Sequence, residues 1–220
     1  MKIKPPRLSE LLSYQCMFFD FDGVVLESGD IKTEAFIELY HGLGIEAEVE
    51  EYHLANQGVS RFRKFKWIAE NLLSQTYTQE MGKELGDCFS LLVKQKVIAA
   101  PFVAGFSEMM DCIAAEDIYC VIASGTPDSE LKSIVKELNI GHWWHEIHGS
   151  PAKKEEIVQD VLSRKGFDRS RCLFCGDAST DHEAAQMTSV DFYARLTDDL
   201  KEYWHKAIYK YGSFDFDGLS

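Results

Sequence analysis

The sequence predicts an α/β fold with a doubly wound parallel sheet and an all-helical domain inserted after the first strand. Short apolar runs alternate with helical patterns of about 10 to 12 residues, which is typical of strands joined by crossover helices. Between about residues 29 and 98, by contrast, the chain shows helical spacing and no strand pattern. With 220 residues, 45% of them hydrophobic, it can bury a core and still carry a smaller insert. We therefore expect a core domain at 1–27 and 98–220 and a helical domain at 28–97.

The predicted strands are short apolar runs of the kind that form buried strands of a parallel sheet. The first covers residues 16–20 and stops at the turn-forming segment Phe21-Asp-Gly23. The other strands are expected at 118–123, 146–148, 172–175 and 190–194. The helices between them are expected at 106–116, 129–138, 154–163 and 181–187. Strands and helices in this alternation form parallel sheets through right-handed crossovers.

The insert shows apolar residues three and four positions apart, which is the spacing of helices that bury one face. They are Ala35, Phe36, Leu39, Phe62, Phe65, Ile68, Leu72, Leu85, Cys88, Phe89 and Leu92. The pattern breaks at 42–45 and at 75–77. Because the insert has two connections to the core, we expect hinges near 25–29 and 97–101.

Charge and hydropathy exclude several classes of partner. The chain carries 23 basic and 36 acidic side chains, and the resulting net charge of −13 repels nucleic acid and anionic membrane surfaces. No apolar run reaches the length of a membrane span, and residues 1–15 lack the apolar stretch of a signal peptide. The expectation is a soluble, cytoplasmic protein with no nucleic-acid or membrane partner. The oligomeric state is left open.

Cysteine and histidine do not indicate a metal or redox centre. The six cysteines have irregular spacing, which predicts no disulfide framework. Cys172 and Cys175 have CxxC spacing, but they lie in an apolar run, where free cysteine packs as a small hydrophobe. His142, His145 and His148 lack companion cysteines, so packing and solvent exposure explain them better than a metal.

Polar residues follow the predicted strands at the point where each strand ends. In an open parallel sheet, ligands bind at the carboxyl ends of the strands. The residues expected there are Asp20, Asp22, Ser124, Gly125, one of Lys153 and Lys154, Asp177 and Asp181. Clustered carboxylates repel one another, so they indicate a hard-oxygen site suited to Mg²⁺. A hydroxyl and a lysine beside such a site could bind a phosphate group and stabilise its charge.

These segments resemble the four motifs of the haloacid dehalogenase-like (HAD) superfamily, and the helical insert resembles its C1-type cap. The segments are Asp-Phe-Asp-Gly-Val-Val-Leu-Glu-Ser at 20–28, Val-Ile-Ala-Ser-Gly at 121–125, Gly-Ser-Pro-Ala-Lys-Lys at 149–154 and Gly-Asp-Ala-Ser-Thr-Asp at 176–181. The resemblance covers nearly the whole chain, except about 14 residues at the N-terminus and the C-terminal tail. One Asp-x-Asp-Gly alone is weak evidence, whereas four motifs in order at strand ends are specific.

The resemblance implies a role for each matching residue. Asp20 corresponds to the nucleophile that forms an aspartyl-phosphate, and Asp22 to the general acid and base. The implied Mg²⁺ ligands are Asp20, the main-chain carbonyl of Asp22, and Asp177, with Asp181 supporting from the same loop. Ser124 and Gly125 correspond to the phosphate-binding segment, although Ser124 could also cap a following helix. The usual spacing favours Lys154 as the motif lysine, and Lys153 stays open.

Within the superfamily, the pattern favours phosphoryl transfer. Dehalogenases of this group lack the second aspartate and need no metal, and phosphonatases have a small residue where Asp22 stands. The resemblance therefore implies a Mg²⁺-dependent phosphomonoester hydrolase that acts on a small phosphorylated metabolite under a mobile cap. The alternatives are a sugar phosphomutase of the β-phosphoglucomutase type and a non-catalytic binding protein on the same fold.

Two further segments have competing interpretations. In the insert, Arg61, Arg63 and Lys64 follow Gln57-Gly-Val-Ser60 and could contact an anionic substrate, as a segment near this place does in C1-capped relatives. Because the same residues lie on an amphipathic helix, an exposed basic face is an equal alternative. The second segment, Asp215-Phe-Asp-Gly218, repeats the first-motif tetrapeptide. No apolar strand is predicted before it, so we interpret it as non-catalytic.

Overall fold

The structure, a computed structural model, describes residues 4–56 and 60–217. It divides into two compact units, one formed by Met1–Glu27 with Ala100–Ser220 and the other by Ser28–Ala99. The second unit ends two residues later than the predicted insert because its last helix continues to Ala99. Among the described residues, no helix is both long enough and apolar enough to cross a lipid bilayer.

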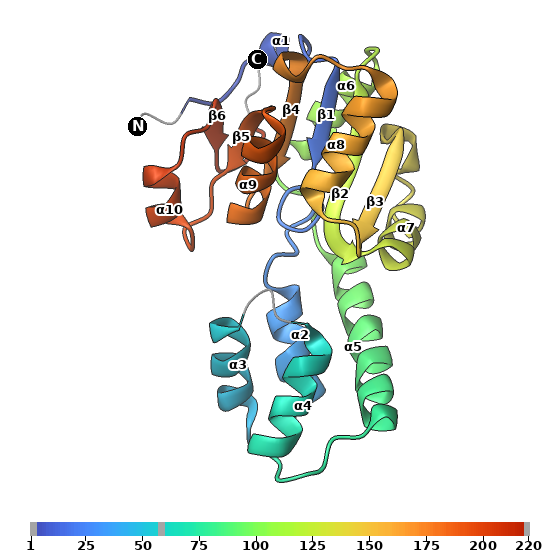
Figure 1. Cartoon of the computed structure of the whole chain (residues 1–220), viewed down its shortest axis with the longest axis vertical. Coiled ribbons are helices and arrows are strands. Elements are labelled where there is room, and N and C mark those ends of the chain that lie inside the picture. Colours follow the sequence, from blue (N-terminus) through green and yellow to red (C-terminus); the bar gives the residue numbers. More distant parts are fainter. Residues whose placement is uncertain (1–3, 57–59, 218–220) are drawn as a thin grey trace. The chain divides into compact units, whose positions relative to one another are not determined.

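The first unit contains a parallel sheet with the strand order β3-β2-β1-β4-β5-β6 (Figure 1). Its strands are β1 (Cys16–Phe19), β2 (Tyr119–Pro127), β3 (Glu146–Ser150), β4 (Cys172–Gly176), β5 (Asp191–Arg195) and β6 (Tyr211–Ser213). The first strand lies between β2 and β4, with Phe19 level with Ile122 and Cys175. The chain thus winds outward in both directions from β1, which confirms the predicted doubly wound fold.

Helices cover both faces of this sheet, so the central strands are buried on both sides. The helices are α6 (Phe106–Ala114), α7 (Asp128–Glu137), α8 (Lys154–Lys165) and α9 (Ser179–Thr188). Phe18 shares a core cluster with Val158 of α8 and Ala185 of α9. The neighbouring residue Phe19 contacts Phe106 of α6, with ring centroids 5.9 Å apart. Successive residues of a strand point to opposite faces, and this explains why the strand is an unbroken apolar run.

The second and third strands extend further than their apolar runs predict. β2 continues through Ser124, Gly125 and Thr126 to Pro127, with a register shift against β3 after Ala123. The expectation that the Ser-Gly-Thr segment follows the strand, or caps a helix, was therefore wrong. Backbone pairing continues although the side chains become polar, and only the apolar part of a strand is visible in a hydropathy pattern.

Three short elements at the ends of the chain were not predicted. They are α1 (Leu8–Leu11), α10 (Lys201–Lys206) and β6. The expectation that no strand precedes the second Asp-Phe-Asp segment was wrong, because β6 ends two residues before Asp215. Phe216 is buried against Phe106 and Tyr193, so this segment is part of the core. Gly218 lies outside the described residues.

The second unit consists of helices only. They are α2 (Ile31–Leu39), α3 (Glu46–Ala55), α4 (Arg61–Asn71) and α5 (Gln79–Ala99). Their apolar faces meet around Phe36, whose ring centroid lies 5.5 Å from that of Phe65 and 4.6 Å from that of Phe89. Residues 57–59, part of the segment that the resemblance links to substrate, lie outside the described residues.

The two chain segments at the border of the first unit pair with each other. The Glu27 amide donates to the Pro101 carbonyl over 2.9 Å, and the Val103 amide donates to the Val25 carbonyl over 3.0 Å. The predicted hinge at 97–101 overlaps α5, which ends only at Ala99. Hinge motion at these segments stays a prediction.

The buried His53 makes the stability of the helical unit depend on pH. Burial, with the nearby charge of Lys64, lowers the pKa of His53 to about 4, whereas an unfolded histidine titrates near 6.5. Between these values the unfolded chain binds the proton more tightly, so stability should fall as the pH is lowered from 6.5 towards 4. Thermal midpoints of His53→Gln should fall less steeply over this range than those of the unsubstituted protein. His41→Gln, at an exposed histidine, is the control. Equal slopes for all three proteins would contradict the assignment.

Candidate active site

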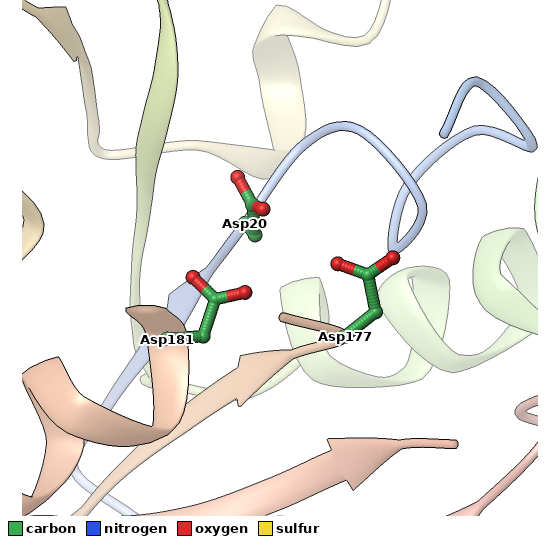
Figure 2. A group of neighbouring side chains, drawn as sticks. All are labelled: Asp20, Asp177 and Asp181. Carbon is green, nitrogen blue, oxygen red and sulfur yellow. The ribbon is translucent and has the colours of Figure 1, made fainter. Parts of the chain in front are cut away.

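Three aspartates converge at the carboxyl edge of the sheet. Asp20 follows β1, Asp177 follows β4, and Asp181 lies in the first turn of α9. Each contributes one carboxylate oxygen to a group whose atoms lie within 4.8 Å of one another. Figure 2 shows the three carboxylates turned towards the same space. The structure thus brings together three of the four aspartates that the sequence analysis selected.

Lys154, the first residue of α8, holds two of these carboxylates. Its Nζ atom lies 2.9 Å from Asp20 Oδ2 and 2.5 Å from Asp181 Oδ1. Lys153 is exposed, and its Nζ atom lies 4.0 Å from Glu155. Position therefore distinguishes the two lysines that the sequence left open, because Lys154 contacts the cluster and Lys153 pairs elsewhere.

The cluster carries more negative charge than one lysine neutralises. Burial, with the charge of Asp181 acting in the same direction, raises the pKa of Asp20 to about 7, even though Lys154 opposes the shift. Burial and the neighbouring carboxylates raise the pKa of Asp177 to about 8. For Lys154, burial alone would lower the pKa, but the charges of Asp20 and Asp181 outweigh it and the pKa is raised. A further cation would relieve this repulsion.

The donor set fits a divalent cation. Asp181 is fully engaged, since Oδ1 accepts from Lys154 and Oδ2 accepts from the Ala178 amide over 3.0 Å. Asp177, by contrast, receives no hydrogen bond from any described residue, although it lies among the other two carboxylates. A buried carboxylate without a donor is the group expected to ligate a hard cation. Asp177 is therefore the best-placed ligand, and Asp181 supports Lys154. Asp20 would bind a cation through a second lone pair of an oxygen that already contacts the Phe21 amide or Lys154.

The carboxylate of Asp22 lies outside this acidic group and is held from β2. Thr126 Oγ1 donates to Asp22 Oδ2 over 2.8 Å. Ser124, which is buried, accepts a hydrogen bond from the Thr126 amide over 3.1 Å, while Gly125 is exposed. Thr126 was not selected from the sequence, although it follows Ser124 by two residues, and in a strand two such side chains point to the same face.

Two glycines allow this close packing. Gly23 has φ +73°, and a Cβ atom there would lie 2.0 Å from Asp177 Oδ2. A Cβ atom on Gly176 would lie 2.3 Å from the Cβ atom of Asp181. Any larger residue at either position would displace an aspartate of the cluster.

Arg195, at the end of β5, fixes the loop that follows β1. Its guanidinium donates to the Gly23 carbonyl over 2.8 Å, to Glu27 Oε1 over 2.6 Å, and to the Phe214 carbonyl over 3.0 Å. The sequence analysis missed this residue. Its place at the end of the last predicted strand, level with the acidic motifs, was the available signal.

Of the three insert cations considered for substrate binding, Arg63 is exposed, whereas Arg61 and Lys64 are engaged inside the helical unit. Lys64 is buried, with Nζ 3.2 Å from His53 Nδ1, and burial lowers its pKa. Arg61 donates to Ser90 Oγ over 2.8 Å and lies over the Phe89 ring. The alternative of an exposed basic face does not hold for Lys64. Neither cation pairs with a carboxylate of a described residue.

The cysteine and histidine groups behave as ordinary structural residues. Cys172 and Cys175 are buried in β4, as predicted. His145 Nδ1 accepts from the Cys120 amide, and His148 pairs with Glu146. Within residues 4–56 and 60–217, these histidines form no group that could hold a metal.

Comparison with known protein families identifies the family of this chain. The profile of a family described as haloacid dehalogenase-like hydrolase matches residues 17–195, a segment that contains all four motifs. The chain belongs to this family. The HAD resemblance inferred from the motifs is thereby confirmed at the level of the superfamily, and the chain is a HAD-family hydrolase. No curated protein matches the sequence.

Solved structures share the HAD fold at low sequence identity. YfnB from Bacillus subtilis, bound to magnesium, superposes with a TM-score of 0.71 at 15% identity, covering 94% of this chain and 96% of YfnB. A mutant of CbbY from Rhodobacter sphaeroides in complex with xylulose-(1,5)bisphosphate gives a TM-score of 0.71 at 13% identity with the same coverage. A predicted phosphoglycolate phosphatase from Haemophilus somnus gives 0.64 at 14% identity, covering 83% of this chain and 85% of the other.

Proposed function

We propose that this HAD hydrolase is a Mg²⁺-dependent phosphomonoesterase that acts on a small phosphorylated metabolite through an aspartyl-phosphate. The observation that carries the proposal is the arrangement of Lys154, which bridges Asp20 and Asp181 while Asp177 keeps an uncommitted carboxylate. This arrangement supplies a positioned nucleophile, a fixed positive charge and a ligand for a cation. Those are the parts that phosphoryl transfer needs.

In the first half-reaction, Asp20 attacks phosphorus. A bond forms between its carboxylate oxygen and phosphorus, and the bond from phosphorus to the leaving alkoxide breaks. Asp22 gives its proton to that alkoxide. Thr126 orients Asp22 for this transfer, and the Phe21 amide, 2.7 Å from Asp20 Oδ1, together with Lys154 orients the nucleophile.

In the second half-reaction, water attacks the aspartyl-phosphate. Asp22, now ionised, takes a proton from the water as the new oxygen–phosphorus bond forms and the bond to Asp20 breaks. Inorganic phosphate leaves, and both aspartates return to their starting protonation states. The same carboxyl group thus acts first as acid and then as base, which requires that Thr126 hold it throughout.

A magnesium ion held by Asp20 and Asp177 would supply positive charge to the phosphoryl oxygens. The electrostatics of the cluster support this assignment, because burial, together with the charges of the neighbouring carboxylates, raises the pKa values of Asp20 and Asp177. The HAD-fold protein YfnB was crystallised with magnesium, and this supports the choice of cation.

The substrate class rests on chemistry and on one relative. The four motifs recognise only phosphate and metal, so specificity must arise elsewhere. We propose Arg61 and Lys64 of the insert as candidates for attracting the anionic substrate, a role that would require them to leave their present partners Ser90 and His53. CbbY binds a sugar bisphosphate, and sugar phosphates are therefore the first class to screen.

The deciding experiment measures metal-dependent hydrolysis and metal binding separately. Hydrolysis of p-nitrophenyl phosphate should require Mg²⁺, stop with excess EDTA and resume when Mg²⁺ is restored. In parallel, Mg²⁺ at 100 times its Kd should stabilise the folded protein by about 2.7 kcal/mol, visible as a higher thermal midpoint. Asp177→Asn should lose this stabilisation, while Asp217→Asn, at an exposed aspartate, should keep it.

Three outcomes would count against the proposal. If EDTA leaves the turnover unchanged, the reaction does not require a metal ion. Isomerised sugar phosphate formed in place of inorganic phosphate, with a requirement for a bisphosphate activator, would identify a phosphomutase. The absence of turnover on every phosphoester tested, with Mg²⁺ binding intact, would indicate a non-catalytic binding protein.

A further inference from the structure

A pocket of about 130 Å³ lies beside α10, at the carboxyl ends of β5 and β6. In Figure 1, α10 lies next to these two strands, at the edge of the sheet that is distant from β3. The lining residues are Leu196, Thr197, Asp198, Lys201, Trp204, His205, Tyr209 and Phe214. All of them follow residue 195, where the family match ends, and none belongs to the acidic cluster.

The wall of this pocket is aromatic and firmly held. Trp204 is buried. Its ring centroid lies 6.0 Å from that of Phe192 in β5 and 6.1 Å from that of Tyr209. Phe214, which also lines the pocket, remains half exposed. An engineered apolar cavity of about 150 Å³ takes up benzene, so this pocket has the volume for one six-membered ring. Flat rings packed against aromatic side chains gain specific edge and face contacts.

Charges of both signs line the same pocket without partners of their own. Lys201 and His205 lie one turn apart on α10, and Asp198 precedes the helix. None of these three side chains has an ion pair or a side-chain hydrogen bond with another described residue. Exposed lysines and aspartates three residues apart commonly pair with each other. Here both charges remain available to a ligand that carries an opposite charge for each.

We propose that this pocket binds a free amino acid with an aromatic side chain. The ring would occupy the space along Trp204, Tyr209 and Phe214, the carboxylate would face Lys201, and the ammonium group would face Asp198. A zwitterion satisfies both unpaired charges at once, whereas a simple anion or cation satisfies one and repels the other. The proposal does not depend on the hydrolase function, since the pocket shares no residue with the acidic cluster.

The test uses the full-length protein and L-phenylalanine as the probe. The indole N–H signal of Trp204, assigned by its loss in Trp204→Phe, should shift saturably in ¹H–¹⁵N spectra, with a Kd of about 1 mM for a ligand of this size. Phenethylamine, which lacks the carboxylate, and 3-phenylpropionate, which lacks the ammonium group, should each bind at least tenfold more weakly. Glycine, which lacks the ring, should cause no shift.

Charge variants supply the matched comparison. Lys201→Glu should weaken phenylalanine binding at least tenfold, while Lys206→Glu, on the same helix but outside the lining, should leave it unchanged. Both side chains are exposed, so neither variant should alter folding. The proposal is overturned if phenylalanine causes no saturable shift. It is equally overturned if phenylalanine, phenethylamine and 3-phenylpropionate bind alike, since the pocket would then select only a ring.

Discussion

Asp20→Asn should abolish hydrolysis of p-nitrophenyl phosphate, lowering kcat by at least roughly 10⁴-fold. An amide lacks the negative charge that attacks phosphorus, so the first half-reaction cannot form its bond. The variant should nevertheless fold. Burial raises the pKa of Asp20 to about 7, which means that its charged form destabilises the folded state. Asparagine has nearly the same shape and no charge, so the substitution removes this destabilisation. We expect a thermal midpoint equal to or above that of the unsubstituted protein.

The chain contains its own control for this experiment. Asp215 begins a second Asp-Phe-Asp-Gly tetrapeptide, after β6 instead of β1. Asp215→Asn should retain full activity, because this residue lies outside the acidic group. The assignment of Asp20 as the nucleophile would be wrong if Asp20→Asn retained activity. It would also be wrong if both variants lost activity equally.

Lys154→Met should lower kcat roughly 10² to 10³-fold, as loss of a fixed charge beside a phosphoryl group does. Its ammonium group is the only described cation in contact with Asp20 and Asp181, so its removal leaves their repulsion unopposed. Breaking a buried ion pair by removing one partner also costs about 3 to 5 kcal/mol of stability. The thermal midpoint should therefore fall together with activity.

Lys153→Met is the matched control for the adjacent position. Lys153 is exposed and lies 4.0 Å from Glu155, so its loss should change neither kcat nor the thermal midpoint appreciably. Steady-state kinetics and thermal denaturation of the two variants, measured with Mg²⁺ present, give the comparison. Equal behaviour of the two would show that the contact of Lys154 with the cluster has no catalytic importance.

The sequence predicted which acidic residues lie together better than it predicted where the strands end. Asp20, Asp177 and Asp181 were found because parallel strands bring their carboxyl ends to one edge, and the motifs lie at those ends. The extension of β2 through Thr126 was missed, because backbone pairing leaves no trace in a polar segment. The Thr126–Asp22 hydrogen bond joins residues 104 positions apart, and a single sequence does not reveal such a pair.

The charged residues were harder to place than the apolar ones. Lys64 was expected either at a substrate or on an exposed face, yet it is buried beside His53. Helical periodicity assigns a lysine to the polar side by its chemistry, but the long side chain can turn inward. For the same reason, the contacts of Arg195 with two separate segments could not be inferred, since each depends on the reach of a flexible side chain.

Arg195 has a consequence for the order of folding. It joins the loop after Asp20 to the strand β5, and the residues of its hydrogen bond to Gly23 lie 172 positions apart. Its contact with the Phe214 carbonyl ties the same side chain to the segment after β6. Contacts between residues far apart in the sequence form slowly, because the chain must first close a long loop. We therefore expect the loop after Asp20 to reach its native conformation late in folding, once β5 has joined the sheet.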